Sequence, residues 1–250
     1  MVATLRQLRP PRAIRWVMRW RWISFLFLAV AIGLSFYFWP WGLLGSCILL
    51  IGAIWSFKVA RHRNRIVGKG SEGEALVAKI LDNLTMDARV IHSIQFESGH
   101  KMREIDHCLI THQAIFCIET KYLRGKIIGL PDDREWTLHK RARKTRSRYK
   151  RGFYNPLKQV ATQIYHLRSY LESHLTPRWA QECSQIWIQG IVVFAHPQGD
   201  ASSVTSAEHG VVTLDHLPKY LENYHPPTRA HRLSYGLRRE IARLLTNETS

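Results

Sequence analysis

The stretch that decides the fold is IDHCLITHQAIFCIETK, residues 105–121. Two apolar runs flank a short polar step, which predicts two antiparallel strands joined by a tight turn at His112 and Gln113. An aspartate, Asp106, stands near the start of this hairpin, and Glu119 and Lys121 stand near its end. Acidic side chains at both ends of an apolar hairpin are the first indication of a functional site.

The register of the hairpin brings its acids together. A two-residue turn would place residue 106 directly opposite residue 119, and opposed side chains lie roughly 5 Å apart on one face. Two neighbouring carboxylates repel each other, and a divalent cation between them removes the repulsion. Lys121 follows on the same face and can approach the same point. Taken alone, this pattern is also compatible with an ordinary amphipathic hairpin whose charged residues lie at fraying strand ends.

A third acid precedes the hairpin. The stretch SEGEALVAKILDNL, residues 71–84, has apolar residues at helical spacing, and Glu74 falls on the apolar face. Glu74 is therefore a candidate ligand. The alternative is a capping box, in which Ser71 and Glu74 satisfy the start of a helix.

Helices and strands alternate along residues 58–250. Strands are predicted at residues 90–96, 126–130, 135–139, 186–194 and 210–217, with a polar turn over 97–104, a helix over 155–175 and two closing helical stretches. Pro156 suits the first turn of the helix. The order predicts an α/β or α+β arrangement around a mixed sheet.

Taken in order, the motifs G-x-x-G-E, I-D-H, E-T-K and N-P-x-x-Q resemble the NERD, or nuclease-related, domain, which is assigned to the PD-(D/E)xK nuclease superfamily. The resemblance covers roughly residues 68–195. The matching residues are Gly70, Gly73, Glu74, Ile105, Asp106, His107, Glu119, Thr120, Lys121, Asn155, Pro156 and Gln159. A basic insert before Asn155 and Ile105 in place of the superfamily's proline depart from the pattern. The resemblance implies a restriction-endonuclease-like mixed β-sheet core flanked by helices.

The resemblance also implies a role for each matching side chain. Asp106 and Glu119 would hold Mg²⁺ or Mn²⁺, with Glu74 completing the metal shell or orienting a water molecule. Lys121 would position or deprotonate the attacking water, and Gln159 would orient Lys121 or bind a backbone phosphate. The implied activity is metal-assisted hydrolysis of phosphodiester bonds, as in a Mg²⁺-dependent deoxyribonuclease.

The charge of the chain points to anionic partners. Thirty-six Lys and Arg against 19 Asp and Glu give a formal net charge of +17, which favours binding to nucleic acid or to a negative membrane surface. The densest basic stretch, residues 140–151, predicts nucleic-acid binding through phosphate contacts, with anionic lipid as the alternative. Its cations are Lys140, Arg141, Arg143, Lys144, Arg146, Arg148, Lys150 and Arg151.

Other chemistries find little support. The four cysteines are widely spaced, with no C-x-x-C pair, which favours a reducing compartment and buried free thiols. A zinc site involving His92, His107 or Cys108 lacks the usual ligand spacing. Walker A and GxSxG motifs are absent from the sequence, which argues against P-loop nucleotide hydrolysis and serine-type catalysis.

A membrane hairpin is predicted before the nuclease-like region. The 36 residues from Trp22 to Phe57 carry no charged side chain, and Pro40 divides them near the middle. Each half approaches the roughly 20 residues that span a bilayer, and tryptophans stand at the ends of both halves. Arginines precede the run and basic residues follow it, so both ends should stay in the cytoplasm. The alternatives are a cleaved signal peptide and two buried soluble helices.

These observations predict five segments: a basic N-terminal segment (1–21), a transmembrane hairpin (22–57), a basic linker (58–69), a nuclease-like domain (70–225) and a C-terminal helix (226–250). The predicted function is a metal-dependent nuclease acting on DNA, with RNA possible, at the cytoplasmic face of the inner membrane. The alternative is a catalytically inactive protein of the same fold that binds nucleic acid or organises a complex at the membrane. The sequence does not indicate an oligomeric state.

Overall fold

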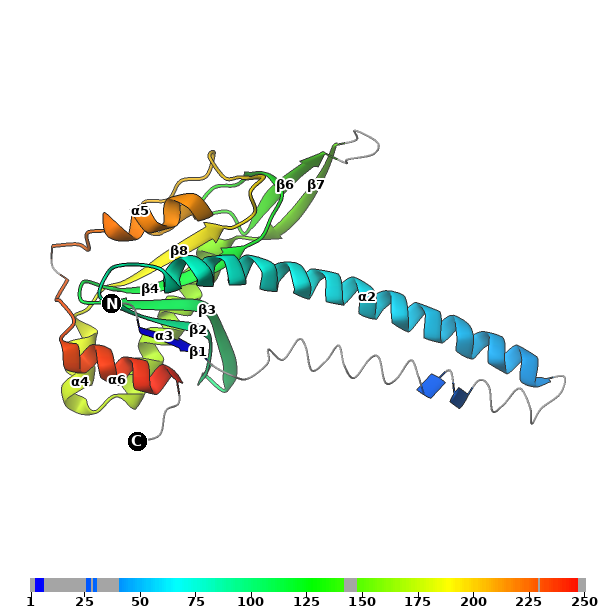
Figure 1. The fold of residues 1–250 in the computed structure, drawn as a ribbon, viewed down its shortest axis with the longest axis horizontal. Helices are drawn as coiled ribbons and strands as arrows, with labels where there is room; N and C mark the ends of the chain where they lie inside the picture. Colours follow the sequence, from blue (N-terminus) through cyan, green and yellow to red (C-terminus); the bar gives the residue numbers. More distant parts are fainter. Residues whose placement is uncertain are drawn as a thin grey trace. The chain divides into compact units, whose positions relative to one another are not determined.

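A computed structural model of the chain describes residues 3–6, 26–27, 29–30, 41–141, 148–228 and 230–246. The side chains of residues 3–6, 41–50, 59–69, 141 and 148 are not described. The chain divides into two compact units, one formed by Met1–Gln7 with Glu72–Ser250 and the other by Leu8–Ser71. The predicted catalytic residues all lie in the first unit (Figure 1).

Two β-sheets form the first unit. In the described residues the larger sheet has the order β1-β2-β3-β4-β8-β10 and the smaller sheet β7-β6-β5-β9. The strands of the larger sheet are β1 (Ala3–Arg6), β2 (Ala88–Ser98), β3 (Lys101–Thr111), β4 (Ile115–Lys121), β8 (Ile188–Phe194) and β10 (Gly210–Thr213). Those of the smaller sheet are β5 (Gly125–Ile128), β6 (Glu135–Arg141), β7 (Arg148–Tyr154) and β9 (Gly199–Asp200). Strands β2, β3 and β4 pair antiparallel, whereas β4 with β8 and β8 with β10 pair parallel. The larger sheet is therefore mixed, as the sequence predicted.

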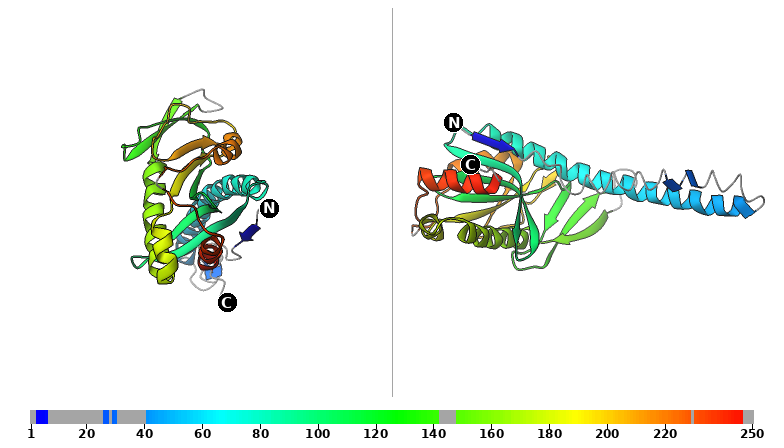
Figure 2. Two further views of the ribbon diagram at one scale, coloured as in Figure 1. Left: turned by 90° about the vertical axis from the view of Figure 1, so that its left-hand side faces the viewer. Right: turned by 90° about the horizontal axis from the view of Figure 1, so that it is seen from below.

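Helices cover both faces of the larger sheet. The helices are α2 (Trp41–Asp82), α3 (Pro156–His174), α4 (Pro177–Ser184), α5 (Leu217–Glu222), α6 (Tyr235–Thr246) and a 3-10 turn (Leu214–His216). Leu167 of α3 and Ile241 of α6 pack in one core with Ile110 of β3. Leu81 of α2 and Leu217 of α5 pack in the other. Figure 2 shows the sheet between α3 on one side and α5 with the last turns of α2 on the other. The unit is a mixed α/β structure in three layers.

Alternation along the strands produces the two cores. Successive side chains in a strand point to opposite faces, so Leu109 enters the α2/α5 core while Ile110 enters the α3/α6 core. This explains why the central strands have continuous apolar runs, because both of their faces are buried.

The β2–β3 hairpin is longer than the sequence predicted. β2 continues to Ser98 and β3 begins at Lys101, so the turn predicted over residues 97–104 is present but shorter than predicted. The turn consists of Gly99 and His100, with φ angles of +61° and +58°. Two successive residues with positive φ are typical of the tight turns whose twist matches antiparallel strands. The polar residues that suggested a longer turn form the more exposed ends of two otherwise largely buried strands.

The first half of the predicted membrane hairpin falls largely outside the described residues. The second half lies in α2, where Ile51, Ile54, Trp55 and Phe57 are exposed. Within the part of the chain that the structure describes, no helix is both long and apolar enough to cross a membrane.

Candidate active site

The hairpin of β3 and β4 has the predicted register. Cys108 pairs with Cys117 and Ile110 with Ile115, and the Thr111 N–H donates to the Ala114 carbonyl at 3.0 Å across the turn. Continued by two residues from Cys108 and Cys117, the same register places Asp106 opposite Glu119. The predicted two-residue turn at His112 and Gln113 is confirmed.

Asp106 lies at a break in the sheet. The β2–β3 pairing passes from His92–His107 to Ile94–Ile105 and omits the step between Ser93 and Asp106. Ser93 has a φ of +53°, a left-handed conformation that is uncommon for serine. The Asp106 Oδ2 atom instead accepts a hydrogen bond from the Thr120 N–H at 2.7 Å. The aspartate is thereby fixed to β4 by its side chain.

Glu119 and Lys121 form an ion pair on β4. The Lys121 Nζ atom donates to Glu119 Oε1 at 2.5 Å and to Gln159 Oε1 at 2.9 Å. Glu119 is only 3% exposed, and its Oε2 atom accepts from Gln163 Nε2 at 2.8 Å. Lys121 therefore lies between the Glu119 carboxylate and the Gln159 side-chain amide. The contact with Gln159 is the one that an orienting role of Gln159 toward Lys121 requires.

Helix α3 carries both Gln159 and Gln163, and the cap at its first turn fixes the position of the helix. The Asn155 Oδ1 atom accepts from the Leu157 N–H, and its Nδ2 donates to the carbonyls of Pro131 and Asp133 at 2.8 and 2.7 Å. Asn155 thus caps α3 and ties it to the β5–β6 connection. Sequence analysis missed Gln163, although its spacing of four from Gln159 places both on one face of the helix. Gln163 also donates to the Glu104 carbonyl at 3.1 Å.

Glu74 reaches the site from α2. Because α2 begins at Trp41, Ser71 lies inside the helix, and the capping-box alternative is wrong. A Cβ atom added to Gly73 would lie 2.8 Å from the Tyr122 Cβ and 3.3 Å from the Thr120 Cγ2. The glycine lets α2 approach the end of β4 closely, and Glu74 follows it directly.

The acids share an unfavourable electrostatic environment. Burial, followed by the negative charges of Glu119 and Glu74, holds the pKa of Asp106 well above its usual range. Burial, then Glu104 and Glu119, also raises the pKa of Glu74. A positive charge placed among these acids would relieve both effects, and carboxylate oxygens suit Mg²⁺ or Mn²⁺.

In the described part of the chain, no group of three or more His, Cys, Asp or Glu side chains is arranged to hold a metal ion. Asp106 and Glu119 bring two carboxylates to one place, and Glu74 contributes charge. Metal binding at these residues stays a prediction.

The histidines and cysteines near the site have other partners. His92 Nδ1 lies 2.8 Å from His107 Nδ1, and His92 Nε2 lies 2.9 Å from Asp82 Oδ1. Cys108 and Cys117 are free and buried, and burial raises the pKa of the Cys108 thiol to about 12. The prediction of buried free thiols is confirmed at these two positions.

The basic insert is part of a β-hairpin. Strands β6 and β7 pair antiparallel and contain Lys140 and Arg141, and Arg148, Lys150 and Arg151, respectively. Lys150 and Arg151 are exposed. Arg143, Lys144 and Arg146 lie outside the described residues. The insert therefore extends the smaller sheet, a geometry that the sequence did not indicate.

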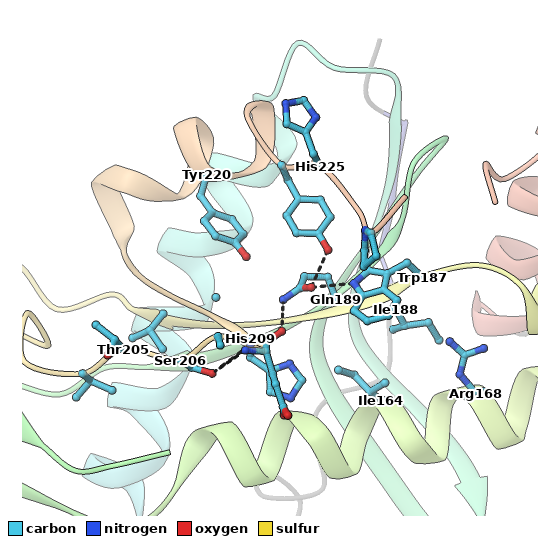
Figure 3. Close-up of a pocket in the computed structure, with 17 residues that line it drawn as sticks. Ile164, Arg168, Trp187, Ile188, Gln189, Thr205, Ser206, His209, Tyr220 and His225 are labelled. Carbon is cyan, nitrogen blue, oxygen red and sulfur yellow. Dashed lines mark hydrogen bonds between the residues drawn. The ribbon is translucent and has the colours of Figure 1, made fainter. Parts of the chain in front are cut away.

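A pocket lies away from Asp106, Glu119 and Glu74. It has a volume of about 910 Å³ and is bordered by α3, β8, α5 and the segment before β10 (Figure 3). Gln189 organises its wall: Oε1 accepts from the Trp187 Nε1 and the Tyr224 hydroxyl, and Nε2 donates to the Gly190 and Glu208 carbonyls. None of the residues that the sequence singled out as catalytic lines this pocket.

Comparison with protein families gives one match. Residues 69–195, about half of the chain, match the family described as NERD, nuclease-related domain. Searches of curated proteins and of solved structures gave no match. The matched residues include the acids of the β3–β4 hairpin, Lys121 and both glutamines of α3.

Proposed function

The chain belongs to the nuclease-related domain family, and from this premise we propose that it is a metal-dependent nuclease that hydrolyses phosphodiester bonds of DNA. The observation that carries the proposal is the facing pair of acids, Asp106 and Glu119, with Lys121 bonded to Glu119. This combination is the one that the resemblance to PD-(D/E)xK nucleases implies. A fold scaffold alone would not require two facing acids, one of which, Asp106, has its pKa raised by burial and by the charges of Glu119 and Glu74.

Each side chain has a distinct task in this proposal. Asp106 and Glu119 would supply oxygen ligands to Mg²⁺ or Mn²⁺, which when bound lowers the pKa of water and neutralises charge on the phosphate. Lys121 places its ammonium group beside the same carboxylate, where it would steady the phosphate and orient the attacking water. Gln159 orients Lys121, and Gln163 fixes Glu119 through the opposite carboxylate oxygen. Glu74 would hold a water molecule from the side of α2.

The proposed substrate follows from the charge of the β6–β7 hairpin. Lys and Arg side chains that contact phosphates release counterions, which gives binding without sequence preference. Lys150 and Arg151 are exposed on β7, five and four residues before Asn155, the cap of α3. The hairpin therefore leads along the chain to the helix that carries Gln159 and Gln163.

The test uses the full-length chain in detergent, incubated with plasmid, linear and single-stranded DNA and with RNA, with Mg²⁺ or Mn²⁺. We expect cleavage that falls at least about 100-fold in Asp106→Asn and Glu119→Gln. Glu172→Gln, an exposed glutamate of α3, is the matched control and should cut normally. Cleavage by Asp106→Asn at the wild-type rate would reject the proposal.

A non-catalytic role is the second candidate. It is favoured by the Glu119–Lys121 pair, which neutralises one acid without any metal. Binding of nucleic acid without cleavage of any substrate would support this candidate, an inactive protein of the same fold that binds nucleic acid or organises a complex.

We also infer that residues 22–57 attach the chain to the inner membrane, with the nuclease-like unit in the cytoplasm. Support comes from the uncharged run and from exposed Ile51, Ile54 and Trp55 in α2. In the doubly substituted chain Ile51→Lys with Ile54→Lys, each lysine adds about 2.5–3.5 kcal/mol to the cost of insertion. Wild type should stay with membranes in alkaline carbonate and this variant should be released. Ile128→Lys with Leu130→Lys, exposed in the other unit, should behave as wild type; retention of the α2 variant would reject the inference.

A further inference from the structure

A small groove opens beside the acidic cluster. Its volume is about 290 Å³, close to the lower end of ligand pockets, which run from about 300 to 1,000 Å³. The lining residues are Met102, Arg103, Glu104, Tyr154, Gln159, Thr162, Gln163 and His166. Glu104, Gln159 and Gln163 also belong to the candidate active site. The groove therefore continues directly from the proposed catalytic position and has room for one nucleotide unit rather than a duplex.

One wall of the groove carries a half-exposed aromatic ring. Tyr154, the last residue of β7, is 49% exposed. Exposed aromatic side chains near nucleic-acid sites are stacking platforms for bases, and stacking requires an open base face. In a duplex that face is covered by the neighbouring base pairs. The ring therefore suits an unpaired base.

The lining of the groove also includes a cation with an unsatisfied donor. The Nε atom of Arg103 is buried and has no hydrogen-bond partner among the described residues. His166 beside it accepts from or donates to Ser98 Oγ at 3.0 Å, and burial and the Arg103 charge lower its pKa. A guanidinium with an unused donor is well suited to a phosphate oxygen. The groove thus offers a base platform and a phosphate donor within one lining.

The exposed face of β7 continues the path. Lys150 and Tyr154 are four residues apart, share one face and lie about 13 Å from each other along the strand. Lys150 is opposite His139 on β6, and His139 is opposite Lys126 on β5, so Lys126 shares this face. On this face Gly152 lies between Lys150 and Tyr154, and a Cβ atom added to it would meet the Oε2 atom of Glu135 at 3.1 Å. A nucleic-acid backbone that leaves the groove along β7 would meet the ammonium group of Lys150 about 13 Å from Tyr154.

We propose that the groove is a subsite for an unpaired nucleotide adjacent to the scissile phosphate, with its base on Tyr154 and its phosphate at Arg103. The substrate class is then nucleic acid with a single-stranded segment, such as an overhang or flap, whose chain runs outward along β7. The description of the phosphate as scissile rests on the proposed nuclease function, whereas binding of the unpaired base does not.

The experiment measures binding of fluorescent oligonucleotides by anisotropy, with EDTA and in an Asp106→Asn background. This background removes one acidic charge and prevents cleavage. Single-stranded DNA, a duplex with an overhang and a blunt duplex are compared. Tyr154→Ala should weaken binding of the unpaired substrates about 5- to 100-fold and change blunt-duplex binding less than about twofold. Tyr154→Phe should retain binding.

Two further variants complete the design. Tyr165→Ala removes a 69% exposed ring of α3 that lies outside the groove and should change nothing. Arg103→Gln should weaken binding and lower the slope of log K against log salt by about one. The inference is overturned if no oligonucleotide binds, if Tyr154→Ala binds single strands as tightly as its parent, or if the loss is equal on blunt duplex.

Cleavage by wild type separates the two proposals. Tyr154-dependent binding of single strands without cleavage in Mg²⁺ or Mn²⁺ would reject the nuclease and retain the subsite. Cleavage combined with indifference to Tyr154→Ala would retain the nuclease and reject the subsite.

Discussion

The ionised form of the Asp106 carboxyl group is less favourable in the folded chain than in the unfolded chain. Its folded-state pKa is raised by burial, Glu119 and Glu74. A raised pKa means that the stability associated with this group is fully present below its ordinary value of 3.8 and is lost as pH rises through the folded value. Each pKa unit corresponds to about 1.4 kcal/mol.

We therefore predict that Asp106→Asn raises the free energy of unfolding near pH 7 without metal, and that the gain shrinks as the pH approaches 4. Urea denaturation at several pH values measures this. Mg²⁺ or Mn²⁺ should stabilise wild type more than the variant, because a cation relieves the same repulsion. A variant less stable than wild type at pH 7 would contradict this account.

The sequence could predict that Asp106, Glu119 and Lys121 meet, because strand register follows from alternation and turn length. It could not predict the left-handed Ser93 opposite Asp106, since serine gives no signal for positive φ. Nor could it identify Gln163 as a residue of the site, because its partners, Glu119 and the Glu104 carbonyl, come from two different strands. Contacts that follow from local residue spacing could be predicted from the sequence, whereas contacts that depend on packing between elements could not.

At the scale of elements, the approach of α2 to β4 depends on Gly73. Gly73→Val would place side-chain atoms against Tyr122 and Thr120, and overpacking of this kind costs about 1–3 kcal/mol. We predict a lower thermal midpoint and a larger loss of nuclease activity than the stability change explains, because Glu74 moves with the helix. Ala75→Val, at an exposed position of the same helix, controls for helix propensity; equal effects of both variants would contradict the prediction.

The β6–β7 hairpin gives a second prediction for an element. Lys150→Glu should weaken binding to single-stranded and duplex nucleic acid alike and lower the salt slope by about one to two. Lys219→Glu makes the same charge change at an exposed position of α5. If filter binding at several salt concentrations shows equal losses for both, the hairpin has no specific role.

Elements differed in how far the sequence determined them. The β3–β4 hairpin and α3 were predictable because apolar spacing and a Pro156 start are local signals. α2 was misjudged because residues 71–84 carry the apolar pattern, whereas the helix continues back to Trp41 across a basic stretch that shows no such pattern. The basic insert gave no strand signal because its residues in β6 and β7 are cationic and pair through backbone hydrogen bonds, whereas the apolar Trp136, Leu138 and Phe153 of the same strands lie outside the insert.

At the scale of the whole molecule, the net charge of +17 is spread over both units. The same excess would favour anionic lipid and nucleic acid, so the two partners can compete. We predict that vesicles containing phosphatidylserine lower the apparent affinity of the full-length chain for DNA, whereas neutral phosphatidylcholine vesicles do not. Anisotropy titrations with both vesicle types measure this, and equal effects would argue against shared charge.

Strand β1 has a consequence for how the chain can be cut. Met1–Gln7 belongs to the same unit as Glu72–Ser250, and β1 pairs with β2 in parallel. Residues 8–71 are therefore an insertion into the unit rather than an extension in front of it. Starting a shortened chain after residue 71 would discard an edge strand and uncover β2, whereas excising residues 8–71 and closing the gap with a flexible linker keeps the sheet whole.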